Sequence, residues 1–134
     1  MRPFHLDSGM RTMRGVFYPT GWMVLMFPGE QQARDAASLL ERNGTGADAM
    51  MLATPQELLR ELVGAEGDDQ FLPSAGTEGD TVRKFEELAA QGHHALMVHA
   101  PHQADSDRVM ELLRDAGISY GQRYRKLVIE DIVA

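Results

Sequence analysis

The sequence contains no cysteine, and this absence removes several kinds of chemistry at once. Without thiols the chain has no disulfide, no thiolate ligand for a metal ion and no cysteine nucleophile. Long apolar runs are also lacking, because the longest, Trp22–Phe27, is far too short to span a bilayer. Residues 1–20 lack the apolar stretch of a secretion signal, so we expect a cytoplasmic protein without a membrane partner.

Basic residues are scarce as well. The 134 residues include 13 Lys and Arg against 20 Asp and Glu, a net charge of −7. Residues 1–21 hold three arginines and one aspartate, which leaves the other 113 residues with a net charge of −9. Such an acidic body argues against a nucleic-acid partner, and a short basic arm offsets this only in part. Arginine outnumbers lysine by 11 to 2, which fits a bacterial, GC-rich genome.

A faint internal repeat carries the fold prediction. The segment 24–44 (VLMFPGEQQARDAASLLERNG) aligns with 97–117 (MVHAPHQADSDRVMELLRDAG) at an offset of 73 residues. Matched pairs are Pro28 with Pro101, Leu39 with Leu112, Leu40 with Leu113, and Gly44 with Gly117. Each copy predicts an apolar strand, a proline-marked turn, an amphipathic helix that stops at glycine, and a second strand. Two such βαβ halves predict a ferredoxin-like sandwich with an antiparallel four-stranded sheet.

Two further helices are predicted between the halves. The run Thr54-Pro55-Gln56-Glu57 combines a Thr N-cap, Pro at the first helical position and Glu three residues after the cap, which predicts a capping box. The predicted class is α/β (α+β), with a basic arm over 1–21 and one ferredoxin-like domain over 22–134 that carries a helical insertion at 54–92. Predicted strands cover 22–27, 48–53, 94–100 and 120–132, and predicted helices cover 30–43, 55–64, 81–91 and 103–116.

Alternation along the two most apolar strands assigns their side chains to two faces of the sheet. Assigned to the side of the repeat helices are Met23, Leu25, Phe27, Leu96, Val98 and Ala100. The opposite face is also apolar, so the inserted helices, the arm or a second subunit must cover it. We expect a homodimer formed through the sheet faces or the inserted helices, with Trp22, Val24, Met26 and Met97 as the candidate interface.

The segment 76–84 (GTEGDTVRK) is the candidate site for a small anionic ligand. Its glycines precede a predicted helix, whose unpaired N–H groups and dipole favour an anion. The candidate ligand-binding residues are Gly76, Thr77, Gly79, Thr81, Arg83 and Lys84. The G-K-[ST] ending of a P-loop is missing, and Glu78 and Asp80 would repel phosphate. The alternative is a flexible loop that is capped by Asp80 or Thr81.

Four histidines lie within ten residues, at positions 93, 94, 99 and 102, which raises the question of a metal site. On a strand, His93 and His99 are about 20 Å apart, and His94 points to the other face. His99 and His102 are the pair that could share one ion, across a strand-to-helix turn. We expect structural or solvent-facing histidines, no metal site and no cofactor.

The C-terminal segment 120–126 (YGQRYRK) alternates aromatic and basic residues, a pattern that can bind nucleic acid. RNA-recognition domains of this fold carry aromatic residues on their two central strands, but 94–100 (HALMVHA) has none and the RNP1 pattern is missing. The favoured alternative is a basic edge strand that discourages edge-to-edge association.

Three stretches, GVFYPTGWMVLMFP, GTEGDTVRKFEELAAQGHHAL and YRKLVIEDI, together resemble a family of short, uncharacterised bacterial proteins. The resemblance covers most of the chain and implies no activity, cofactor or site. The half from 22 to 64 is also loosely similar to the βαβ halves of bacterial general-stress proteins.

The functional prediction follows from the lack of a catalytic motif in these patterns. No serine lies in a G-x-S-x-G elbow, and adjacent carboxylates diverge along a helix or strand. We therefore expect a non-enzymatic small-ligand-binding or regulatory, stress-related module. Two alternatives stay open, namely a small ferredoxin-like enzyme with a pocket on the sheet face and an RNA-binding protein.

Overall fold

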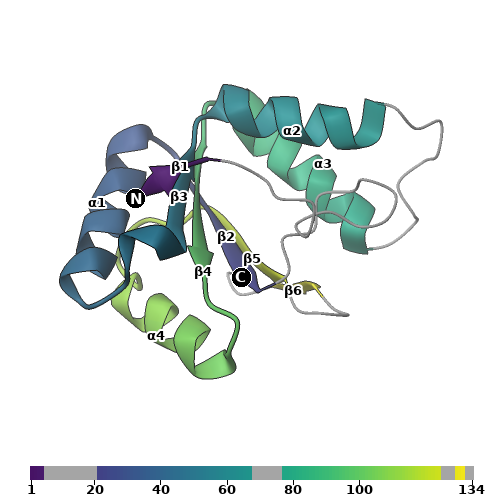
Figure 1. Ribbon diagram of the computed structural model, residues 1–134. Helices are drawn as coiled ribbons and strands as arrows, with labels where there is room; N and C mark the ends of the chain where they lie inside the picture. Colours follow the sequence, from purple (N-terminus) through teal and green to yellow (C-terminus); the bar gives the residue numbers. More distant parts are fainter. Residues whose placement is uncertain (5–20, 68–76, 125–128, 132–134) are drawn as a thin grey trace.

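The computed structural model describes residues 1–4, 21–67, 77–124 and 129–131 as a mixed α+β fold (Figure 1). Its strands are β1 (Arg2–Pro3), β2 (Trp22–Phe27), β3 (Met50–Ala53), β4 (His94–His99), β5 (Tyr120–Tyr124) and β6 (Ile129–Asp131). Its helices are α1 (Glu30–Arg42), α2 (Pro55–Gly67), α3 (Thr77–Ala90) and α4 (Gln103–Leu112), and a 3₁₀ turn covers Ala47–Ala49. The strand–helix–strand unit predicted from the repeat therefore occurs twice, as β2-α1-β3 and β4-α4-β5.

One sheet holds all of these strands, in the order β1-β3-β4-β2-β5-β6. β2 pairs antiparallel with β4, from Trp22 opposite His99 to Phe27 opposite His94, and antiparallel with β5 on its other side. β3 runs antiparallel to β4. The prediction that 22–27 and 94–100 contain adjacent, central, antiparallel strands is confirmed.

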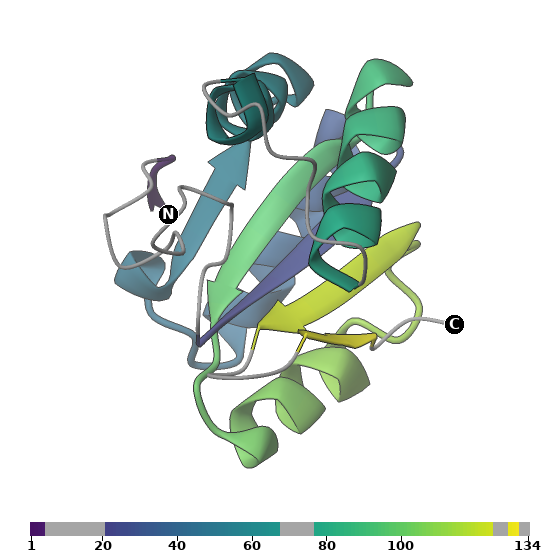
Figure 2. The same cartoon turned by 90° about the vertical axis from the view of Figure 1, so that its right-hand side faces the viewer.

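Helices cover both faces of the sheet, which explains why β2 is apolar at every position (Figures 1 and 2). The buried cluster between the sheet and the helices α1 and α4 consists of Met23, Leu25, Phe27, Ala33, Ala36, Ala37, Leu40, Met50, Leu96, Val98, Ala100, Val109 and Leu113. The buried cluster between the sheet and the helices α2 and α3 consists of Trp22, Val24, Met26, Met51, Ala53, Leu58, Leu62, Phe85, Leu88, Ala89, Ala95 and Met97. The two faces that alternation predicts for β2 and β4 are therefore confirmed.

The inserted helices are the cover of the apolar face that contains Trp22. Trp22 is 7% exposed in the single chain, and Val24, Met26 and Met97 are fully buried. Phe85 of α3 belongs to the same cluster of buried side chains. Of the covers that the sequence left open, the inserted helices remove this face from water. Trp22, Val24, Met26 and Met97 are thus core residues of one chain, and a homodimer through the inserted helices stays a prediction.

Local sequence signals set the ends of α1 and α2. The amide of Thr54 donates to Glu57 Oε1 over 2.9 Å, and the amide of Glu57 donates to Thr54 Oγ1 over 3.1 Å, which confirms the capping box. α1 buries the predicted stripe of Ala33, Ala36, Ala37 and Leu40. It ends before Gly44, whose φ of 99° lies in the left-handed region that favours glycine.

Four element boundaries differ from the prediction by two or more residues. α2 ends at Gly67, not at 64. β3 begins at Met50, not at 48, because Ala47–Ala49 forms a 3₁₀ turn. α3 begins at Thr77, not at 81. α4 ends at Leu112, not at 116, because the chain tightens into a turn before Gly117, whose φ is 86°.

The C-terminal region forms two strands where the sequence predicted one long strand. β5 pairs antiparallel with β6, with Gln122 opposite Asp131, so the chain reverses direction between them. β5 therefore has a neighbour on each side, and Arg123 does not lie on an edge strand as predicted. The basic residues 125 and 126 lie outside the described ranges. Part of the predicted arm also joins the sheet, since Arg2 and Pro3 pair in parallel with β3. Residues 5–20 of the arm lie outside the described ranges.

Candidate functional site

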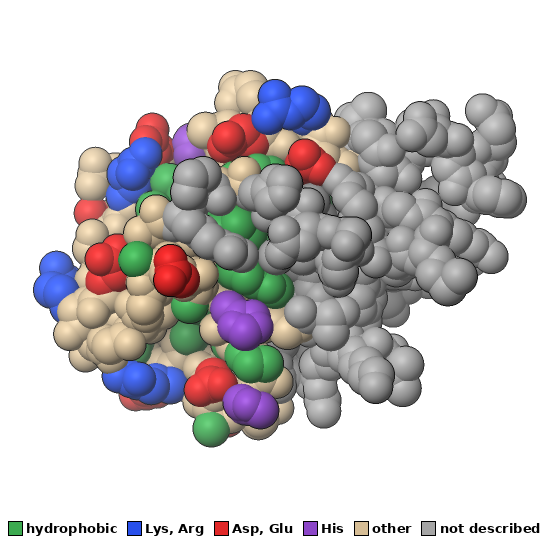
Figure 3. All heavy atoms as spheres, in the orientation of Figure 1, with side chains coloured by type: hydrophobic (Ala, Val, Ile, Leu, Met, Phe, Trp, Pro, Cys, Tyr) green, Lys and Arg blue, Asp and Glu red, His purple; other side chains and the backbone are tan. Residues whose placement is uncertain are grey.

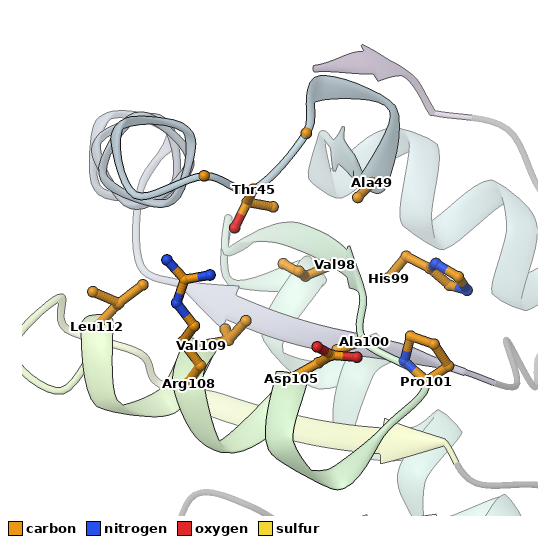
Figure 4. A pocket seen from close by; sticks show the side chains of 12 residues that line it. Thr45, Ala49, Val98, His99, Ala100, Pro101, Asp105, Arg108, Val109 and Leu112 are labelled. Carbon is orange, nitrogen blue, oxygen red and sulfur yellow. The ribbon is translucent and has the colours of Figure 1, made fainter.

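A hollow of about 290 Å³ opens between α4 and the connection from α1 to β3 (Figure 4). Its walls come from three segments that are distant in sequence, namely 44–49, 98–101 and 105–112. Val98, Ala100 and Val109 form its buried apolar floor, and Ala49, Pro101 and Leu112 supply accessible apolar surface. The polar side chains that line it are Thr45, His99, Asp105 and Arg108. An apolar hollow with a few convergent polar groups is the usual form of a small-molecule site.

The connection from α1 to β3 owes its path to glycine. Asn43 caps α1, and its Nδ2 donates to the carbonyl oxygen of Leu39 over 2.8 Å. Gly44 then takes the left-handed conformation and turns the chain toward α4. Gly46 has an ordinary φ of −70° and precedes the 3₁₀ turn. Because neither glycine carries a side chain, the hollow stays open along this wall.

Arg108 is the principal cation of the hollow. Its guanidinium extends from α4 toward Thr45 (Figure 4), and its Nη2 donates a hydrogen bond to the carbonyl oxygen of Asn43. Within the described residues, this carbonyl is its one hydrogen-bond acceptor, and no carboxylate pairs with it. A guanidinium has five N–H donors in a planar fork that matches a carboxylate or phosphate. Most of these donors are therefore available to a ligand.

Asp105 lines the same hollow from the first turn of α4. A spacing of three residues places its Cβ about 5–6 Å from that of Arg108. No ion pair joins the two side chains in the part of the chain that the structure describes. The Asn43 carbonyl draws the guanidinium toward the end of α1, away from the carboxylate. The hollow therefore presents a positive and a negative group separately.

His99 and His102 lie at opposite ends of the turn from β4 to α4. His99 is exposed, lines the hollow and packs its ring against Trp22, with ring centroids 5.1 Å apart. His102 is the N-cap residue of α4, and its side chain makes no capping hydrogen bond. Among the residues with described positions, no three His, Asp or Glu side chains group closely enough to hold a metal ion. A metal shared by these two histidines would have no third protein ligand there.

His93 connects the turn before β4 to the start of β5. Its Nδ1 lies 2.8 Å from Ser119 Oγ, and Ser119 Oγ lies 3.1 Å from the carbonyl oxygen of Met26. If the hydroxyl donates to the carbonyl, the imidazole must donate to the hydroxyl. That arrangement ties β4, β2 and β5 together and does not activate the serine as a nucleophile.

The internal repeat also relates this hollow to a second one. A second hollow of about 470 Å³ lies between α1 and α4 and is lined by Gln32, Asp35, Ala36 and Leu39. The offset of 73 residues carries these four positions onto Asp105, Arg108, Val109 and Leu112, which line the first hollow. The equivalent helix faces thus differ in charge, since Asp35 stands where the other copy has Arg108. This departure from the repeat is the sequence signal that could have revealed Arg108.

The candidate anion segment 76–84 is only partly described. Gly76 lies outside the described residues, and Thr77, Gly79 and Thr81 fall in the first turns of α3, where side chains are not described. Arg83 and Lys84 are exposed on α3. Lys84 Nζ lies 3.9 Å from Glu87 Oε2 and 5.9 Å from the centroid of the Tyr120 ring. Lys84 is therefore already engaged, and the anion loop stays a prediction.

The described part of one molecular face shows basic, acidic and histidine side chains interspersed (Figure 3). They do not gather there into a patch of one sign, as a nucleic-acid surface would require. No helix in the described ranges is long and apolar enough to cross a membrane.

Comparison with family models, curated proteins and solved structures found no match for this chain. The resemblances noted in the sequence therefore stay predictions. Function rests on the chemistry of the site.

Proposed function

We propose that the protein is a non-enzymatic, ferredoxin-like regulatory module that binds a small molecule with an acidic group in the hollow between α4 and the α1–β3 connection. Arg108 is the main support for the proposal, because its guanidinium lines the hollow and, within the described residues, donates to no carboxylate. Thr45 supplies a hydroxyl beside it (Figure 4). The order β3-β4-β2-β5, with α1 and α4 on one face, supports the ferredoxin-like assignment.

The chemistry of the hollow favours binding over catalysis. Activation of a nucleophile requires a base within hydrogen-bond reach of it. The hydroxyl of Thr45 has no such partner among the described residues. His99 contacts the ring of Trp22 and no carboxylate that would orient it, again within the described part of the chain. Charged and apolar groups without an activated nucleophile fit a binding site.

The alternatives named from the sequence have less support. An enzyme pocket or an RNA platform on the sheet face would need that face to be open. Trp22, Val24 and Met97 are instead buried beneath α2 and α3. The homodimer also stays a prediction, and it now needs a surface outside this core.

The test measures thermal unfolding in the presence of small acids. The probes are inorganic phosphate, acetate, 4-methylpentanoate and L-leucine, each at millimolar concentration. A ligand whose free concentration is ten times its Kd stabilises the folded state by about 1.4 kcal/mol. We therefore expect at least one probe to raise the Tm by several degrees. Arg108→Gln should abolish that shift. The ligand-induced shift is compared, not the Tm itself, because the substitution also removes the contact with Asn43.

Two further variants locate the binding. Arg114→Gln removes an exposed arginine that pairs with Glu111 at 3.4 Å and does not line the hollow, so it should leave the shift intact. The double substitution Arg83→Ala, Lys84→Ala tests the candidate anion loop in the same assay. A shift that survives Arg108→Gln and disappears in the double variant would move the site to α3. No shift with any probe would contradict the proposed function.

A further inference from the structure

The two opposite charges of the hollow restrict what it can bind. Arg108 attracts a carboxylate, but Asp105 lines the same hollow and repels it. A plain anion therefore meets one favourable and one unfavourable charge. A molecule that carries an amino group as well as an acidic group would satisfy both side chains.

The separation of the charges is built into the fold. Asp105 and Arg108 leave α4 three residues apart, a spacing at which opposite charges often pair with each other. Here the carbonyl of Asn43 accepts a hydrogen bond from Arg108 Nη2, and Figure 4 shows the guanidinium directed toward Thr45 while the Asp105 carboxylate lies near Ala100. Asn43 is the C-cap residue of α1, and Gly44 turns the chain directly after it. Within the described residues, neither charge is paired with an opposite one, and both side chains are exposed at the hollow.

The size and apolar lining of the hollow limit the rest of the ligand. A volume of about 290 Å³ equals the liquid volume of roughly ten water molecules, at about 30 Å³ each. Ala49, Pro101 and Leu112 offer it accessible apolar surface, above a buried floor of Val98, Ala100 and Val109. A ligand of about ten non-hydrogen atoms with a hydrocarbon side chain fits these limits.

We propose that the hollow binds a zwitterion, an α-amino acid with an apolar side chain, through its carboxylate on Arg108 and its ammonium on Asp105. This inference rests on the proposed function and names the class of its ligand. The carboxylate lies beside the guanidinium fork and the hydroxyl of Thr45. The ammonium donates to the Asp105 carboxylate, and the side chain packs on the accessible apolar surface of Pro101 and Leu112.

The experiment compares each amino acid with the same molecule without its amine. Calorimetric titration measures the Kd of L-valine, L-leucine and L-phenylalanine beside 3-methylbutanoate, 4-methylpentanoate and 3-phenylpropanoate. We expect at least one amino acid to bind about tenfold tighter than its counterpart, which corresponds to one charge-assisted hydrogen bond. Asp105→Asn should remove that preference by weakening the amino acid about tenfold, without weakening the plain acid.

Asp107→Asn is the matched control. It removes the same charge from α4 at a position that does not line the hollow and that accepts a hydrogen bond from Gln103, so both affinities should persist. Plain acids that bind as tightly as the amino acids, in an Arg108-dependent way, would overturn the zwitterion and leave the proposed function standing. If none of the six compounds binds, the zwitterion is overturned, and the proposed function then depends on phosphate and acetate in the thermal assay. Equal loss of both ligand types in Asp105→Asn would also overturn the assignment of the ammonium.

Discussion

Glu30 and Arg34 form a charged pair at the start of α1. Arg34 Nε donates to Glu30 Oε2 over 2.6 Å, and both side chains are about half exposed. This hydrogen bond and the positive charge of Arg34 lower the pKa of Glu30 below its ordinary value, with a smaller contribution from His94. A lowered pKa in the folded state stabilises the protein above the ordinary pKa of the carboxyl group. That stabilisation is lost as the pH falls through the folded-state pKa.

The first prediction concerns this carboxyl group. Arg34→Gln should raise the pKa of Glu30 toward its ordinary value, because it removes the positive charge and replaces the charged Nε donor with a neutral amide. An NMR titration of the side-chain carboxyl carbon measures it. Arg114→Gln serves as the control, since Arg114 pairs with Glu111 elsewhere, and it should leave the titration of Glu30 unchanged. An unchanged pKa in Arg34→Gln would show that the pair does not persist in solution.

At the scale of elements, the two glycines in the connection from α1 to β3 differ in backbone conformation. Gly44 and Gly46 both line the hollow, but Gly44 has a φ of 99° and Gly46 a φ of −70°. A Cβ added at Gly44 would meet Arg108 Nη2 at 3.7 Å, an ordinary contact, and one added at Gly46 would meet nothing within 4 Å. Backbone conformation, and not space, therefore separates the two positions.

The second prediction uses this matched pair. Gly44→Ala should lower the free energy of unfolding by about 1–2 kcal/mol, because an L-residue is strained in the left-handed region. Gly46→Ala should change it by less than about 1 kcal/mol, and in the stabilising direction if at all. Urea denaturation measures both variants. Equal effects of the two substitutions would mean that the turn at Gly44 relaxes at no cost.

The elements were predictable to the extent that their signals are local. The apolar run of β2, the Ala and Leu stripe of α1 and the Thr54–Glu57 capping box each depend on a few neighbouring residues, and each lies where the sequence predicts. The start of α3 and the division of 120–132 into β5 and β6 depend on partners elsewhere in the sheet. Such boundaries are set by tertiary packing, which no single segment contains.

The hollow could not be predicted from the sequence, for the same physical reason. Thr45, Asp105 and Arg108 are common surface residue types in segments that are about sixty residues apart in the chain. They become neighbours only because α1 and α4 pack on the same face of the sheet. The repeat predicted that shared face, but it did not say which charged positions would lie between the helices.

At the scale of the whole molecule, the burial of Trp22 means that its mutation should lower the stability of the single chain. Trp22 belongs to the core that α2 and α3 close over the sheet, and it is 7% exposed. The large apolar residues of this face thus hold the inserted helices to the sheet. A residue of this kind stabilises the single chain whether or not a second chain binds.

The third prediction follows from that role. Trp22→Ala should lower the free energy of unfolding by about 3–5 kcal/mol, the usual cost of truncating a large buried aromatic side chain. His99→Ala removes the ring contact with Trp22 from an exposed position and should cost less than about 1 kcal/mol. Urea denaturation gives both values, and light scattering after size exclusion gives the number of chains in each species. A Trp22→Ala variant that unfolds like the wild type but dissociates from a dimer would restore the interface role.

The ends of the sheet have a consequence for how copies of the protein meet. The long strands β2 and β4 are interior, and the described edges are the short strands β1 (Arg2–Pro3) and β6 (Ile129–Asp131). A foreign strand that approached either described edge would find two or three residues with which to form a ladder. Edges as short as these make such pairing unfavourable. The most apolar strands of the chain are therefore kept from seeding cross-β aggregates.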